Sequence, residues 1–123
     1  MASELALSGL TVAFTKANVP SVSFTAGSLS VTVTGNQIMD NVQSIGTSEE
    51  AILLGDVATG GYWFVQNMDG TNFVELRSGT GATDFIKLLA GEWAIFRTSA
   101  DASAPYAIAD TASCNVRFLR FDL

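Results

Sequence analysis

The sequence has no histidine and a single cysteine, Cys114, among its 123 residues. Histidine is the commonest general base and metal ligand in proteins, and a disulfide within one chain needs two cysteines. The composition therefore disfavours most hydrolase and zinc chemistry and excludes an intrachain disulfide. With no histidine to activate it, Cys114 is expected to be a buried and inert thiol.

Basic residues are also scarce. Six lysines and arginines stand against twelve aspartates and glutamates, which gives a net charge of -6 and an isoelectric point near 4.2. Seven acidic residues and one basic residue, Lys16, lie in residues 1–76, whereas residues 77–123 hold five of each sign. A protein of this charge repels the phosphate backbone. Nucleic acid is therefore not expected as a partner.

Long apolar runs are missing as well. The longest, at residues 51–54, 62–65 and 93–96, have four residues each, far short of the roughly 20 that a membrane helix needs. Glu4 lies where a secretory signal carries basic residues, and no apolar segment of signal length follows it. We expect no membrane association and no export by that route, so that the chain is made in the cytoplasm of the producing cell.

Apolar residues are nevertheless abundant, at 48% of the chain, and they alternate with polar ones in the period of two that is typical of strands. The strand-like segments are residues 5–14 with a break at Gly9, 22–24, 29–33, 38–45, 62–68, 71–77, 85–89, 93–97, 106–109 and 114–123. Turn residues separate them at intervals of about ten, as in antiparallel sandwiches. The sequence predicts a single all-β domain over residues 1–123, a jelly-roll-like antiparallel β-sandwich of nine or ten short strands.

Three local patterns lead to specific expectations. The parity of the apolar positions changes at Gly9, which predicts a β-bulge there. Residues 47–55 are interpreted as a strand, although Thr47 and Glu50 form a capping-box pattern that would also suit a short helix. Asp69-Gly70 between two strand-like runs predicts a type I′ hairpin that pairs Val65 with Val74.

Some strands are apolar at both parities, so that something must cover their second faces. A loop over residues 99–104 is one possible cover and a subunit interface is another, since aromatic residues are enriched at interfaces. The candidate interface residues are aromatic side chains and arginines, namely Tyr62, Trp63, Phe64, Trp93, Phe96, Tyr106, Arg97, Arg117 and Arg120.

No pattern of catalytic or ligand-binding residues stands out. The twelve carboxylates are scattered, Asp69-Gly70-Thr71-Asn72 lacks the ligand series of a calcium loop, and no glycine-rich stretch precedes a Lys-Ser or Lys-Thr pair. We therefore expect no catalytic residues, no metal and no cofactor, and interpret the protein as a non-enzyme.

One stretch supports a resemblance. Residues 55–69, the triplet Asn72-Phe73-Val74 and residues 88–97, with Ala90-Gly91-Glu92 before an apolar strand that ends in Arg97, resemble small β-sandwich virion proteins of tailed bacteriophages. The resemblance covers residues 55–121, and the first 50 residues are not part of it. It implies a capsid decoration (cement) protein on the virion exterior, or a tail or fibre component, with the major capsid protein or another virion protein as partner.

Two classes of function remain open from the sequence. One is a structural virion protein that stabilises the shell through protein-protein contacts and forms a homo-oligomer, expected to be a trimer. The other is a carbohydrate- or receptor-binding sandwich, in which exposed aromatic rings would stack on the ligand. Exposure of the two tryptophans should distinguish these classes.

Overall fold

The computed structural model describes residues 5–32, 37–55, 57, 61–99 and 105–122. The chain divides into two compact units, Met1–Thr34 and Gly35–Leu123. The sandwich predicted over residues 1–123 occupies the second unit, and the first forms a unit of its own. The all-β prediction is confirmed, since the described residues hold twelve strands and no helix, and so none long and apolar enough to cross a membrane.

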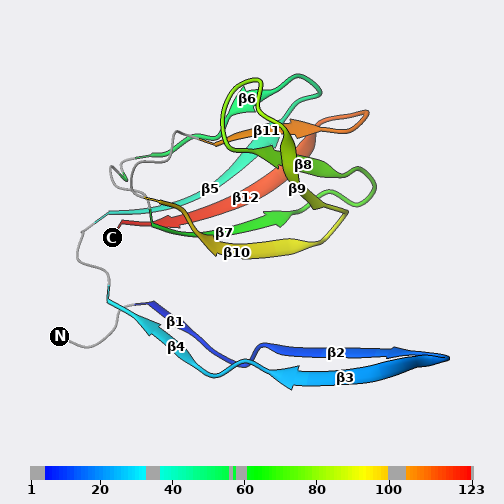
Figure 1. Ribbon diagram of the computed structural model, residues 1–123. Helices are drawn as coiled ribbons and strands as arrows, with labels where there is room; N and C mark the ends of the chain where they lie inside the picture. Colours follow the sequence, from blue (N-terminus) through cyan, green and yellow to red (C-terminus); the bar gives the residue numbers. More distant parts are fainter. Residues whose placement is uncertain (1–4, 33–36, 56, 58–60, 100–104, 123) are drawn as a thin grey trace. The chain divides into compact units, whose positions relative to one another are not determined.

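Eight strands build the second unit as two four-stranded antiparallel sheets (Figure 1). One sheet has the order β10-β7-β12-β5 and the other the order β6-β11-β8-β9. The bounds are β5 (Ile38–Ile45), β6 (Glu50–Ala51), β7 (Tyr62–Asn67), β8 (Val74–Arg77), β9 (Asp84–Leu88), β10 (Trp93–Arg97), β11 (Tyr106–Ala109) and β12 (Cys114–Phe121).

The strand pairing is nested. β8 pairs with β9, β7 with β10, β6 with β11 and β5 with β12, all antiparallel. This is one long hairpin rolled up so that successive pairs fall in alternate sheets, which is the jelly-roll arrangement. Only β8 and β9 are consecutive strands within one sheet, and every other connection crosses between sheets.

The core lies between the two sheets. Alternate residues of β7 and β12 point inward and are almost fully buried, as are those of β8 and β11. The largest buried side chains are Trp63 and Phe118, whose rings meet edge to face with centroids 6.4 Å apart. Cys114 is buried as expected, and burial raises the pKa of its thiol.

The hairpin predicted at Asp69-Gly70 is wrong, because β7 and β8 belong to different sheets. Residues 68–73 instead carry the chain across the sandwich. The Asp69 carboxylate accepts the amide N–H groups of Thr71 and Asn72, at 2.8 and 2.6 Å, and this turn stabilises the crossing. Gly70 does not have positive φ, so no type I′ turn forms.

This correction leads to a prediction on two glycines. Gly91 has φ +81 and open space where a Cβ would stand, whereas Gly70 has the same open space without positive φ. Gly91→Val should lower the free energy of unfolding by about 1–3 kcal/mol through backbone strain alone. Gly70→Val should stay within about 0.5 kcal/mol of the parent. Chemical denaturation of both variants checks this, and equal losses would contradict the assigned turn.

The strand expected at residues 47–55 is shorter than the sequence suggests. The strand predicted over residues 47–55 shrinks to the two residues of β6, and residues 52–54 have no regular structure. This short strand adds to the edge of its sheet, where it pairs with Tyr106 and Ala107 of β11.

The first unit is a two-stranded ribbon. It consists of β1 (Leu5–Leu7), β2 (Thr11–Lys16), β3 (Val19–Thr25) and β4 (Leu29–Val31). β2 pairs with β3, and β1 pairs with β4. The turn at its tip holds Asn18 at φ 64, a left-handed conformation that asparagine tolerates, and the register shifts beside it between Phe14 and Lys16.

The break at Gly9 is not the bulge that the sequence predicted. Leu7 pairs with Leu29 and Thr11 with Thr25, so residues 8–10 and 26–28 supply equal lengths of chain and neither strand has an extra residue. In both strands of the ribbon the apolar residues switch from odd-numbered to even-numbered positions at the same level, where Gly9 has φ +77. A glycine in that conformation lets the ribbon depart from regular pairing without strain.

Candidate interface

The outward side of the β10-β7-β12-β5 sheet, hereafter the outer face, has an unusual composition for a solvated surface. Its side chains alternate with the buried ones of the same strands. Cross-strand partners on it form rows, such as Ile95, Phe64, Leu119 and Asp40. The members are Ile38, Asp40, Val42, Ser44, Tyr62, Phe64, Gln66, Trp93, Ile95, Arg97, Asn115, Arg117, Leu119 and Phe121.

Apolar side chains dominate the outer face. Trp93 is 47% exposed, Val42 49% and Ile38 61%. The rings of Phe64 and Trp93 stack with centroids 6.0 Å apart, which joins β7 to β10 on the surface. An outward sheet face in an acidic protein is ordinarily polar. The composition is that of a surface suited to a protein contact.

The charged groups of the outer face are paired. Arg117 donates two hydrogen bonds to Asp40, at 3.0 and 2.8 Å, and these hold the pKa of that carboxyl below its ordinary value. Arg97 lies over the Tyr62 ring, 4.8 Å from its centroid. Flat guanidinium groups on an apolar surface supply specificity to a contact.

The structure gathers five of the nine candidate interface residues on this face: Tyr62, Phe64, Trp93, Arg97 and Arg117. In the strands that are apolar at both parities, one set of apolar residues therefore lies in the core and the other lies on the outer face. The loop considered as an alternative cover, at residues 99–104, lies outside the described residues except for Ser99.

The other four candidates lie elsewhere. Trp63 is 1% and Arg120 5% exposed, which places both inside the sandwich and beyond the reach of a partner. Arg120 donates a 2.7 Å hydrogen bond to the Val57 carbonyl and lies over the Trp63 ring. Phe96 packs against the core, and Tyr106 is half-buried on β11 of the other sheet.

Sequence reasoning missed several residues of the outer face, namely Ile38, Val42, Ile95, Leu119 and Phe121. The alternation of residues along each strand did contain information about them. Ile95 alternates with the inward residues Ala94 and Phe96, but in the run Trp-Ala-Ile-Phe an apolar residue occupies every position. Only the pairing of β10 with β7 shows which parity faces outward.

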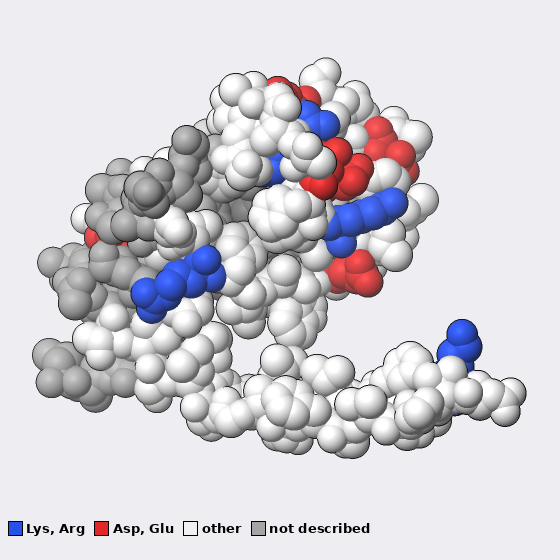
Figure 2. Space-filling model, in the orientation of Figure 1, with Lys and Arg blue, Asp and Glu red and all other residues white. Residues whose placement is uncertain are grey.

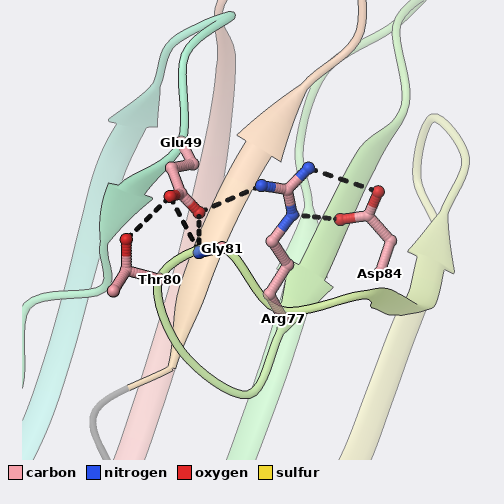
Figure 3. A network of polar contacts seen from close by, with 5 residues as sticks. All are labelled: Glu49, Arg77, Thr80, Gly81 and Asp84. Carbon is pink, nitrogen blue, oxygen red and sulfur yellow. Dashed lines mark hydrogen bonds and ion pairs between the residues drawn. The ribbon is translucent and has the colours of Figure 1, made fainter.

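A polar network lies beside the other sheet (Figure 3). The Glu49 carboxylate accepts hydrogen bonds from the Thr80 hydroxyl at 2.8 Å and from the Gly81 amide at 3.0 Å. Arg77 donates to Glu49 at 3.0 Å and also binds Asp84. The network ties the loop after β8 to the start of β6, so it holds a sheet edge in place.

This network leads us to expect that the melting temperature depends on pH. Hydrogen bonds from the Gly81 amide, and to a smaller extent from the Thr80 hydroxyl and Arg77, hold the pKa of Glu49 below its ordinary value of 4.5. Outside this network, the backbone amides of Asn72 and Thr71 hold the pKa of Asp69 below its ordinary value of 3.8. A depressed folded-state pKa stabilises the fold above the unfolded pKa and loses this contribution as pH falls through the folded value. The melting temperature should therefore be flat from pH 7 to 5 and fall below about pH 4.5.

The control is Glu49→Gln, which cannot titrate. Its melting temperature should be lower than that of the parent at pH 7, because the Gln amide group cannot accept from Gly81 and Arg77 as the carboxylate does. The gap between parent and variant should narrow as the pH falls to 3. A gap that stays constant over this range would show that Glu49 does not contribute to the acid transition.

A cavity of about 210 Å³ lies between the two sheets. Its wall is almost entirely apolar and includes Trp63, Phe85, Ile86 and Phe96, with Arg77 and Arg97 also contributing. Such a cavity suits a small apolar group rather than a polar substrate. Among the described residues, no three His, Cys, Asp or Glu side chains lie close enough to hold a metal ion.

Comparison with known proteins adds little. No family model and no curated protein matches the sequence. A solved structure described as "Bacillus endospore appendages form a novel family of disulfide-linked pili" is similar at 15% identity, with a TM-score of 0.47, over 77% of this chain and 97% of that chain. At that level the likeness carries no argument about function.

Proposed function

We propose that this protein is a non-enzymatic structural component of a larger particle, and that it binds that particle through the outer face of its sandwich. The observation that carries the proposal is the composition of the outer face. Aromatic and aliphatic side chains that are 39–61% exposed lie on β5 and β10, the two edge strands of this sheet, in a protein with net charge -6. Burial of such a surface against a partner is favourable in proportion to its area.

The finer proposal is a decoration protein on the exterior of a tailed-phage capsid. It is supported by the sequence resemblance over residues 55–121 and by the negative charge, which disfavours a place against packaged DNA inside the shell. A protein that binds only the assembled shell stabilises it by mass action, to a degree set by occupancy and affinity. No chemical step is needed for this role.

The binding test uses two isoleucines on opposite sides of the sandwich. Ile95→Glu places a charge on the outer face, beside Phe64 of the neighbouring strand β7, whereas Ile108→Glu places it on the outward side of β11. Capsids that lack the protein are incubated with each variant and sedimented. Ile95→Glu should weaken binding about tenfold or more, because a carboxylate would be buried without a partner, and Ile108→Glu should bind as the parent does.

Equal binding by both variants would exclude the outer face as the docking surface. Electron microscopy of virions separates the finer alternatives. Density on the capsid exterior supports decoration, density on the tail transfers the role to a tail or fibre component, and absence from purified virions contradicts a virion protein altogether.

A carbohydrate- or receptor-binding role is favoured by one observation, the 47% exposure of Trp93 beside Phe64. Such an aromatic surface can stack on a sugar ring. Titration with oligosaccharides while tryptophan fluorescence is followed would detect it. A saturable change that Trp93→Ala removes would favour this role over decoration.

A further inference from the structure

The first 34 residues are unlike the rest of the chain in charge. Lys16 is the one charged residue between positions 5 and 32, whereas residues 35–123 carry eleven acidic and five basic residues. In Figure 2 the charged side chains in view gather on the sandwich, and the ribbon is white apart from one basic group. The ribbon therefore lacks the charged groups that normally keep open strand edges apart.

One face of the β2–β3 half of the ribbon is an apolar stripe of four residues, Val12, Phe14, Val22 and Phe24. Val12 pairs with Phe24 and Phe14 with Val22, and each of the four is 44–58% exposed. The opposite face carries the pairs Thr11 with Thr25 and Ala13 with Ser23. The pattern is that of a strand pair with one apolar face and one polar face.

The other half of the ribbon, β1 with β4, also pairs apolar residues but is more buried, since Val31 is 7% exposed and Leu5 and Leu7 are half-buried. Leu5 pairs with Val31 and Leu7 with Leu29, so apolar residues face each other across this half too. With Leu10, Val19 and Leu29, each 42–45% exposed, on the order of 500 Å² of apolar side-chain surface meets water. That is near the upper end of what a soluble monomer leaves exposed, and an isolated two-stranded ribbon is only marginally stable in water.

We propose that the ribbon is the self-association element of the protein, and that its apolar stripe packs against the same stripe of other copies of this chain. Contacts between copies through residues 35–123 bring two net charges of -6 together, whereas contacts through the ribbon do not. Specific recognition of a foreign partner draws on charged and polar groups, which the stripe lacks. A symmetric contact between two copies needs no charged or polar groups, because the two surfaces are identical and can pack against each other.

The proposal rests on the structural role proposed above and on the homo-oligomer expected from the sequence, and it gives the protein a second binding surface. The ribbon would join copies of the protein, while the outer face of each sandwich stays free to bind the particle. Several outer faces held together in this way would bind a repetitive shell with the combined strength of a multivalent ligand.

The test is a charge exchange at Phe24, with Ser23 on the opposite face as its matched control. Phe24→Glu and Phe24→Lys should each weaken self-association about 100-fold, because like charges would meet at the stripe. Ser23→Glu should leave it unchanged. Mixing equal amounts of the two Phe24 variants should recover association at least tenfold, since each stripe then meets one of opposite charge. Sedimentation velocity measures the mass in each case.

Both tryptophans lie in residues 35–123, so their fluorescence reports whether the sandwich of each variant is folded. Association of the parent with no effect of either Phe24 variant would overturn the ribbon proposal and leave self-assembly standing. Loss in the Phe24 variants without recovery on mixing would show that the stripe docks elsewhere, and would also overturn it. A parent that is monomeric at all concentrations would overturn both the ribbon proposal and the self-assembling role.

Discussion

Replacement of Trp63 by alanine is expected to lower the free energy of unfolding by about 3–5 kcal/mol, the usual cost of removing a fully buried tryptophan. The ring is 1% exposed and stacks on Phe96 with centroids 6.3 Å apart. Its Nε1 donates to the Thr98 hydroxyl at 3.3 Å. The substitution would also remove the ring beneath the buried Arg120 guanidinium, 5.1 Å from its centroid.

Trp93 is the control for this prediction, because it is the other tryptophan and lies in the neighbouring strand. Its ring is on the outer face and 47% exposed, so Trp93→Ala should cost about 1 kcal/mol or less in unfolding free energy. Urea denaturation followed by circular dichroism measures both. Similar losses in the two variants would mean that the assignment of inward and outward residues on β7 and β10 is wrong.

The second large effect is expected at Asn67, which is fully buried. Its Nδ2 donates to the carbonyls of Asn72 and Leu88, at 2.9 and 3.1 Å, and its Oδ1 accepts the Asp69 amide at 3.0 Å. One side chain thus satisfies three backbone groups where the chain crosses between the sheets. Asn67→Leu keeps the volume and leaves those groups without this partner, which should cost about 3 kcal/mol or more.

The neighbouring Gln66 provides the control. It faces outward, and its single hydrogen bond, from Nε2 to the Gly91 carbonyl, is long at 3.5 Å. Gln66→Leu should change the unfolding free energy by about 0.5 kcal/mol or less. If Asn67→Leu were as mild as Gln66→Leu, the crossing after β7 would not depend on the buried amide.

The sequence was sufficient to locate most strands but not their partners. Alternation located the strands at residues 38–45 and 93–97 correctly, and the strand expected at 62–68 ends one residue earlier, because one face of each strand is in the core. It failed at Asp69-Gly70, where a turn dipeptide between two strands has the same local signature whether the strands pair or cross between sheets. The buried Asn67 is the feature that distinguishes the two, and its burial depends on distant residues such as Leu88.

The candidate surface was predictable only in part. The excess of aromatic residues at both parities correctly indicated a second apolar face, but not which of Trp63 and Trp93 lay on it. Neighbouring strands decide this, and their pairing depends on contacts far apart in the sequence. The ribbon was recognisable as strands from Val12, Phe14, Val22 and Phe24, yet its exposure has no local signal, because a buried and an exposed apolar strand alternate in the same way.

The central claim is that this chain is a structural protein that assembles with copies of itself, and its mass in solution tests it most directly. Sedimentation equilibrium of the unmodified protein over about 1–100 μM, a range in which specific assemblies of this kind form, should show a discrete closed oligomer with a mass that is a multiple of 12.9 kDa. A single species of 12.9 kDa at every concentration would contradict the claim.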